Sequence, residues 1–136
     1  MLRKMMWAVV AGVAFPWVAW GQDENPLIAQ VRAAVTDASK PFVMVIRIEV
    51  RPGKGPELER AFAPAVAATR REKGCLAYDL ARAAGSPESY ILYERWASLD
   101  DLKAHLETPH ITELLPKLGE ITAEPVQMDL YLPAAE

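Results

Sequence analysis

Four segments of the chain alternate apolar and polar positions in the way that is typical of β-strands. They are 42–50, 76–81, 90–96 and 126–132. The first is the clearest, because Arg47 and Glu49 alternate there with apolar, mostly β-branched residues. The polar stretch 82–89 contains a Gly-Ser-Pro sequence, a combination that favours turns. We therefore expect the second and third segments to form an antiparallel hairpin.

Apolar residues recur at intervals of three and four between these strands, and this spacing predicts helices. The helices are expected within 22–40, 57–73, 98–107 and 108–119. Asn25 and Ser98 are candidate N-caps, and Thr108 is a third. Pro64 falls inside its segment and predicts a kink there or two shorter helices.

Glycines mark the expected ends of two of these helices. Gly74 follows the segment 57–73, and Gly119 closes the segment that starts at Thr108. Because glycine is common just after the last helical residue, we expect both helices to stop there.

The order of elements is strand, helix, strand, strand, helix in two pieces, strand. This is the split β-α-β arrangement of ferredoxin-like domains, an α+β fold with a four-stranded antiparallel sheet. Helices would cover one face of the sheet only, while Val43, Val45 and Tyr131 would leave apolar surface on the other. Because that face needs a cover, we expect a homodimer in which two sheets stack into an α+β barrel.

The first 21 residues have the pattern of a secretory signal peptide. Arg3 and Lys4 precede an uncharged apolar run, and small residues precede a possible cleavage site after Gly21. The run is shorter than the roughly 20 residues of a spanning helix. We expect an exported protein, periplasmic or secreted, without a stable membrane anchor; an uncleaved anchor is the alternative. This divides the chain into a signal peptide (1–21), a lead helix (22–40) and one domain (41–136).

Charge and cysteine content argue against several classes of function. The chain has 15 basic and 18 acidic residues, and loss of Arg3 and Lys4 would leave 13 against 18, a net charge of −5. No basic cluster is present, so we expect no nucleic-acid partner. Cys75 is the single cysteine, which rules out an intrachain disulfide. The sequence has neither a CxxC nor an HExxH motif, and we expect no metal site.

A carboxylate, a tryptophan and two histidines occur together between residues 94 and 110. Glu94 and Trp96 share one face of the strand 90–96, because side chains alternate along a strand. His105 lies on the inner side of the next helix, and His110 falls in the first turn of the helix after that. Because the surrounding sequence is apolar, this group predicts a pocket for a small molecule.

Each of these residues also has a purely structural interpretation. Trp96 is either a wall on which a flat ring stacks or a core residue. A buried carboxylate such as Glu94 needs a partner. That partner is either a histidine, whose basicity it would raise, or an arginine such as Arg47 or Arg70; Glu94 is also a candidate base with a raised pKa. The histidines are either proton acceptors or hydrogen-bonded residues at helix ends.

Four short pieces of the sequence carry a resemblance to a known family. They are Val50-Arg51-Pro52-Gly53, Glu72-Lys73-Gly74-Cys75, Tyr90 to Ser98 and His105 to His110. From about Val43 to Leu132 the chain resembles the antibiotic biosynthesis monooxygenase (ABM) family, and within it the small bacterial quinol monooxygenases. The resemblance implies a dimeric α+β barrel. It also implies that O2 oxygenates electron-rich aromatic rings, in many members without metal, flavin or haem, so we expect no cofactor.

This resemblance gives the candidate residues definite roles. His105 or His110 would take a proton from a phenol, since a neutral imidazole suits proton transfer near pH 7. Glu94 would orient a histidine. The residues expected to hold the ring are Trp96, Tyr78 and Tyr93. The partners would be a small aromatic substrate and O2.

Two other functions stay open. The same pocket could sequester a small aromatic or lipid-like ligand without catalysis. Haem degradation is a third option, because haem-degrading relatives combine an asparagine in the first strand with a tryptophan and a histidine. Trp96 and His105 are present here, but the strand 43–50 contains no asparagine.

Overall fold

The computed structural model describes residues 7–10, 13–16 and 24–135. The expected cleavage site after Gly21 lies outside these residues. The strands are β1 (Trp7–Val10), β2 (Val13–Pro16), β3 (Phe42–Glu49), β4 (Cys75–Arg82), β5 (Ser89–Trp96) and β6 (Gln127–Tyr131). The helices are α1 (Pro26–Ala34), α2 (Gly55–Thr69), α3 (Leu99–Leu106) and α4 (Pro109–Ile121).

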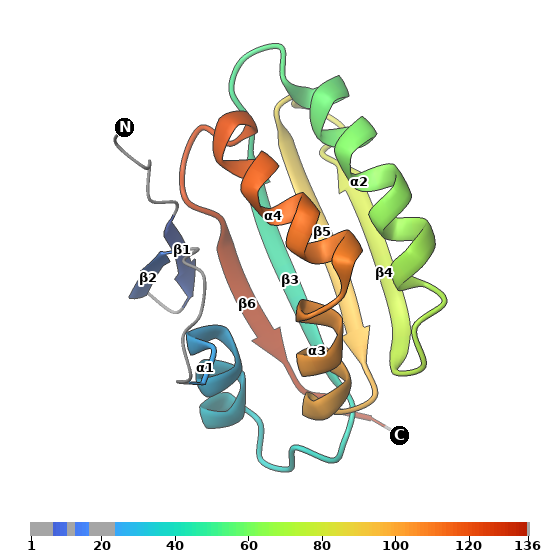
Figure 1. The fold of residues 1–136 in the computed structure, drawn as a ribbon. Coiled ribbons are helices and arrows are strands. Elements are labelled where there is room, and N and C mark those ends of the chain that lie inside the picture. The colour runs from blue at the N-terminus through green and yellow to red at the C-terminus, as the bar shows by residue number, and fades with distance from the viewer. Residues whose placement is uncertain (1–6, 11–12, 17–23, 136) are drawn as a thin grey trace.

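The four predicted strands form one antiparallel sheet in the order β6-β3-β5-β4. The helices α2, α3 and α4 all lie on one face of this sheet (Figure 1). This arrangement confirms the ferredoxin-like α+β fold. The short strands β1 and β2 fall within the expected signal segment, and β1 pairs with β6 at the edge of the sheet.

The core lies between the sheet and the helices that cover it. Alternation along β5 turns Tyr90, Leu92, Glu94 and Trp96 toward the helices, and all four are buried. The helices contribute buried apolar residues in return, among them Leu58, Phe62, Leu102, Leu114 and Leu118. Full burial of each such side chain contributes roughly 1.5–3 kcal/mol. This packing fixes the position of α3 and α4 over β5.

The ends of the helices differ from the sequence prediction in two places. Helix α2 begins at Gly55 and continues past Pro64 as one element, so the alternative of two shorter helices is wrong. Pro64 lies on the exposed side of α2, where water can bond to the carbonyl group of Arg60 that the proline leaves free. Helix α4 likewise runs through Gly119 to Ile121.

Gly74 does not end a helix, since α2 stops at Thr69. It is buried against the side chain of Asp101, and a Cβ atom at this position would collide with that side chain. Gly74 therefore lets the loop after α2 pass close to the first turn of α3. The N-cap prediction for α3 is confirmed, because the amide of Asp101 donates to the hydroxyl oxygen of Ser98 at 3.2 Å.

Helix α1 packs at one end of the domain, beside α3 (Figure 1). The side-chain oxygen of Asn25 accepts a bond of 2.9 Å from the amide of Leu27, as an N-cap should. Ile28 and Val31 are buried against the core. The amide of Leu99 also donates to the carbonyl of Ala38, which ties the segment after α1 to the start of α3. The lead helix is therefore part of the domain.

No helix of the described residues covers the second face of the sheet. Ile91 and Tyr131 lie on this face and are 40% and 52% exposed.

Within the described part of the chain, no helix has the length and apolar character that crossing a membrane requires.

Candidate active site

A cavity of about 50 Å³ lies between the sheet and the helices. Three of its lining residues are polar: Tyr78 of β4, Glu94 of β5 and His105 of α3. They are neighbours, because Tyr78 is opposite Glu94 in the strand pairing and its ring centroid is 5.4 Å from that of His105. We call these three residues the polar end of the cavity. The remaining lining residues are apolar and form the apolar wall; most come from β3, α3 and α4, and α1 adds Leu27.

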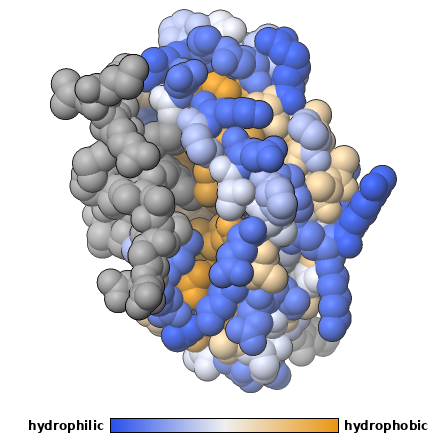
Figure 2. All heavy atoms as spheres, in the orientation of Figure 1, coloured by the Kyte–Doolittle hydropathy of each residue, from blue (hydrophilic) through white to orange (hydrophobic). Residues whose placement is uncertain are grey.

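Polar residues cover most of the helical face of the molecule. Figure 2 shows the most hydrophobic residues in a narrow strip between them, with paler orange residues to the right of it. The residues of the apolar wall that keep some contact with solvent are Leu27, Ile46, Leu106 and Leu115. Three of these belong to α1, α3 and α4, so we expect a ligand to enter the cavity where these helices meet.

His105 is held by a carboxylate. Its Nδ1 atom is 3.0 and 3.1 Å from the two carboxylate oxygens of Glu72. Because an ionised carboxylate only accepts hydrogen bonds, Nδ1 carries the ring proton. The other ring nitrogen, Nε2, then has a free lone pair, and the ring to which it belongs lines the cavity. This is the arrangement by which a carboxylate orients a histidine that acts as a base.

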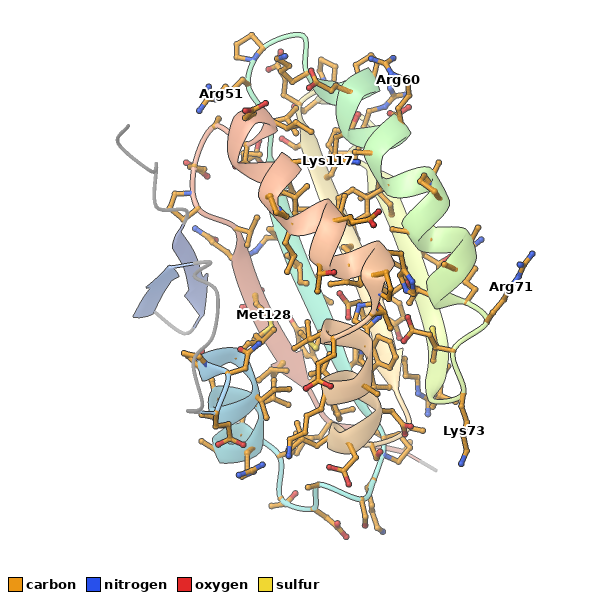
Figure 3. All side chains as sticks on the ribbon, in the orientation of Figure 1. Arg51, Arg60, Arg71, Lys73, Lys117 and Met128 are labelled. Carbon is orange, nitrogen blue, oxygen red and sulfur yellow. The ribbon has the colours of Figure 1, made fainter. Side chains whose placement is uncertain are left out.

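Glu72 comes from the turn that follows α2, where its carbonyl accepts from the amide of Cys75 at 3.2 Å. Its neighbours Arg71 and Lys73 point away from the molecule (Figure 3). The side chain of Glu72 is directed the other way, toward the helices, and is 17% exposed. The turn therefore separates one inward carboxylate from two outward cations.

Burial decides the protonation state of His105. The side chain is 3% exposed, and this burial lowers its pKa below the usual 6.5, although the nearby Glu72 partly opposes the shift. His105 is therefore neutral at pH 7, and its contact with Glu72 is a hydrogen bond of a neutral imidazole. A neutral imidazole is the form that can accept a proton.

Glu94 forms a hydrogen bond with Trp96 and with neither histidine, so its expected role of orienting a histidine is wrong. Its carboxylate accepts a bond of 2.7 Å from the indole nitrogen of Trp96. The expected arginine partners are also absent, because Arg47 pairs with Asp129 and Arg70 with Asp79. Burial raises the pKa of Glu94 to about 7, although the bond from Trp96 opposes the shift. Glu94 is therefore partly protonated near neutral pH.

Trp96 is a core residue and does not line the cavity. It is fully buried, and its ring centroid is 4.5 Å from that of His105. It packs against the imidazole of His105 and donates a hydrogen bond to the carboxylate of Glu94. This contact supports the structural interpretation of Trp96 and gives it a positioning role.

The two tyrosines of the prediction lie on opposite faces of the sheet. Tyr78 is 2% exposed and lines the cavity, and burial raises its pKa, so its hydroxyl group keeps its proton. Tyr93 alternates with Leu92 and Glu94 along β5 and therefore faces the uncovered side. The expectation that Tyr93 binds the ring inside the same cavity is wrong.

His110 lies behind the polar end of the cavity rather than in its lining. Its Nε2 atom is 2.6 Å from a Glu72 oxygen and 3.2 Å from the hydroxyl oxygen of Thr108. The hydroxyl group of Thr108 donates to the carbonyl of His105 at 2.7 Å. Glu72 therefore joins both histidines and brings α2, α3 and α4 together at one point.

The sequence also matches a model of a known protein family. Residues 41–116, more than half of the chain, match the family model described as antibiotic biosynthesis monooxygenase. The chain belongs to this family.

Relatives of this ABM-family chain differ in what is known of them. An uncharacterised protein of Synechocystis, sll1783, is 27% identical over 97 residues, which cover 71% of this chain and 66% of that protein. A haem oxygenase (mycobilin-producing) of Mycobacterium tuberculosis is 35% identical over 71 residues, covering 52% of this chain and 68% of that protein. The solved structure of Rv0793 from the same organism has a TM-score of 0.66 at 29% identity and covers 71% of this chain and 98% of its own.

Two features of this ABM-family chain were not predicted. Glu72 was overlooked as a site residue, although it belongs to one of the four pieces that carry the family resemblance. It lies between Arg71 and Lys73, and such a run of charges normally indicates a solvated turn. The second feature is the contribution of α1 to the cavity: the helix itself was predicted, but it lies outside the matched residues 41–116 and yet supplies Leu27 to the apolar wall.

Proposed function

We propose that the protein is an exported, cofactor-independent monooxygenase that oxidises a quinol-like or polyphenolic ring with O2. The observation that supports this most is the position of His105. Its imidazole borders an apolar cavity and is oriented through Nδ1 by Glu72. Such a base can take a proton from a phenol in a site from which water is largely excluded.

The reaction begins with transfer of a phenolic proton to Nε2 of His105. The resulting quinolate passes an electron to O2 far more readily than the neutral quinol does. The oxygen then bonds to a ring carbon, the second oxygen atom leaves as water, and the ring becomes a hydroxylated quinone. One quinol and one O2 therefore give one hydroxyquinone and one water. The apolar wall provides the dry space for this step, and Tyr78, which lines the cavity and keeps its proton, is the candidate donor to a ring oxygen.

The size of the cavity limits what enters it without rearrangement. A volume of about 50 Å³ accepts a molecule such as O2. An aromatic ring needs more, since an engineered apolar cavity that binds benzene has about 150 Å³. We therefore propose that the helices around Leu27, Leu106 and Leu115 separate when the substrate binds.

Oxygen consumption by the purified protein, freed of metal with a chelator, tests the proposed activity. We expect uptake that saturates with a menadiol-type or catechol substrate and exceeds autoxidation. A His105→Ala/His110→Ala variant serves as the control. Product mass separates a monooxygenase, which adds one oxygen atom, from an oxidase, which releases peroxide. If the wild-type protein consumes no more oxygen than the variant with any of the quinol or catechol substrates, the proposal fails.

The alternative functions give different outcomes in the same assays. Ligand binding that survives loss of both histidines, with no turnover, would favour a non-enzymatic binding module. Because a relative from M. tuberculosis is named as a haem oxygenase, haem should be tested together with the quinols and catechols. The absence of asparagine from β3 speaks against haem as the ligand of this chain. A haem titration followed by absorption decides this point.

We also propose that two copies of the chain pair through the uncovered face of the sheet. Ile91 and Tyr131 are exposed there, and Val43, Val45 and Tyr93 are only half-buried. These apolar residues form a patch among charged ones such as Arg47 and Asp129, and an apolar patch on a sheet face is normally covered. Sedimentation of the wild-type protein and of Tyr93→Lys tests the pairing: a dimer is expected for the first and a monomer for the second.

Export rests on the pattern of the first 21 residues. We propose that a signal peptidase removes them after Gly21, which makes the quinol or polyphenol a compound found outside the cytoplasm. Mass spectrometry of the protein recovered from a periplasmic fraction checks both the compartment and the cleavage site. Recovery of the full-length chain from the cytoplasm would contradict the proposal.

A further inference from the structure

Three side chains with metal-binding atoms converge at the rim of the site. They are Glu72, His105 and His110, and one ligand atom from each lies within 4.8 Å of the others. The shortest separations are 2.6 Å from Glu72 to His110 Nε2 and 3.0 Å from Glu72 to His105 Nδ1. In a tetrahedral zinc site with bonds of about 2.0–2.2 Å, neighbouring ligand atoms are about 3.3 Å apart. Small side-chain movements would therefore accommodate an ion.

We propose that Glu72, His105 and His110 form a binding site for a divalent transition-metal ion, with zinc as the expected occupant. Two imidazoles and one carboxylate are the protein ligands of many zinc sites and of non-haem iron sites that keep an open coordination position. The sequence shows no metal motif because the ligands come from three elements: the turn after α2, helix α3 and the first turn of α4.

The surroundings of the three ligands suit an ion that arrives from solvent. The side chains of Glu72 and His110 are 17% and 22% exposed, while that of His105 is 3% exposed. Two ligands can therefore meet a hydrated ion at the surface before the third binds it. The cations nearest in sequence to Glu72, Arg71 and Lys73, point away from the molecule and leave the carboxylate free for this use (Figure 3).

Metal binding would change which nitrogen of His105 carries the ring proton. The ion needs the lone pair of Nδ1, so the neutral ring keeps its proton on Nε2, the nitrogen that acts as the base in the proposed reaction. The cavity would then contain a hydrogen-bond donor in place of a base. This consequence rests on the proposed function, and it makes zinc an inhibitor of the oxygenase.

Titration of the full-length, chelator-treated protein with Co²⁺ tests the site without any assay of activity. We expect one equivalent of Co²⁺ to produce the visible absorption of a four- or five-coordinate ion, and Zn²⁺ to displace it. Glu72→Gln and His110→Ala should each weaken binding by more than about tenfold, the lower end of the loss found even for residues that only support a ligand. Both residues are partly exposed, so these variants should fold.

Glu120→Gln is the matched control, because it removes an exposed carboxylate from the opposite end of α4. It should bind Co²⁺ as the wild-type protein does. No stoichiometric Co²⁺ spectrum in the wild-type protein would overturn the proposal. Binding that is equally strong in the Glu72 and His110 variants would overturn it too, since the ion would then bind elsewhere.

Oxygen uptake with and without Zn²⁺ separates this proposal from the proposed function. Inhibition that a chelator reverses, and that Glu72→Gln reduces in proportion to its loss of Co²⁺ binding, supports both. A Co²⁺ spectrum in a protein that consumes no oxygen when metal-free keeps the metal site and rejects the oxygenase. Oxygen uptake in a protein that binds no Co²⁺ keeps the oxygenase and rejects the metal site.

Discussion

The two parts of the cavity are held in place by different forces. At the polar end, hydrogen bonds fix two of the three groups: Glu72 binds His105, and Trp96 donates to Glu94. The apolar wall depends on packing alone, and Leu27 reaches it from a helix outside the family-matched residues 41–116. For the proposed oxygenase, this contrast predicts that the family segment carries out the reaction, while the added helix limits the size of the substrate. Changes at the polar end should therefore alter rates, and changes in the wall should alter substrate choice.

The largest effect is expected from His105→Ala, which removes the proposed base. General-base catalysis contributes about 10²–10⁴-fold, so kcat/KM for quinol-dependent oxygen uptake should fall by that factor. His110→Ala is the matched comparison and should cost less than about tenfold, because His110 touches Glu72 and does not line the cavity. Equal losses in the two variants would mean that the proton does not go to His105. Circular dichroism checks that both variants are folded.

Glu94→Gln should change how stability depends on pH. The pKa of Glu94 is raised in the folded protein from 4.5 to about 7, so its contribution to stability is present below 4.5 and is lost as the pH rises through 7. By linkage the loss amounts to at most about 3 kcal/mol. A neutral glutamine can still accept a hydrogen bond from Trp96. Because it does not titrate, its contribution to stability does not change with pH.

Urea unfolding of the wild-type protein and of Glu94→Gln at pH 5 and pH 8 measures this difference. The other titrating groups of this region, Glu72, Tyr78 and His105, are common to both proteins and cancel in the comparison. The variant should gain stability relative to the wild type at the higher pH. Parallel pH profiles would show that Glu94 is ionised in the folded protein throughout this range.

Leu27→Ala tests the apolar wall. Because Leu27 is only half-buried, the loss of stability should be about 1–2 kcal/mol, less than the ~2–5 kcal/mol of a fully buried leucine. The enlarged cavity should lower KM for two-ring substrates several-fold and leave kcat for single-ring substrates unchanged. Leu132→Ala, at an exposed leucine, is the control. A fall in kcat as large as that of His105→Ala would remove the distinction between the two parts of the cavity.

Local sequence patterns correctly predicted the strand and the helix start that position the residues of the candidate site. Alternation placed Glu94 and Trp96 together on β5, and the candidate N-cap Ser98 placed the start of α3. Both signals act over a few residues, where backbone geometry leaves little choice. The same alternation excludes Tyr93 from the cavity, and the sequence prediction did not apply it there.

Contacts between residues that are far apart in the sequence could not be predicted from such local patterns. Glu72 is 33 residues from His105 and 38 from His110, so its role depends on how α2, α3 and α4 pack. The sequence prediction correctly identified Glu94 as a carboxylate in an apolar strand and then assigned it the wrong partner. The actual partner is the indole N–H of Trp96, two residues further along the same strand. Periodicity identifies which face a residue occupies but not which of several polar groups it meets.

The smallest effect is expected from Tyr78→Phe, which removes one hydrogen-bond donor from the polar end. A net hydrogen bond of about 0.5–1.5 kcal/mol corresponds to a rise of KM by roughly 3- to 10-fold, with kcat nearly unchanged because the tyrosine keeps its proton. Tyr93→Phe is the matched control, since it makes the same change on the other face of the sheet and should leave both constants as they are. Steady-state oxygen uptake measures both variants. If Tyr78→Phe lowers kcat as strongly as His105→Ala, the proton passes through the phenol as well, and the polar end works as a relay rather than as a single base beside a donor.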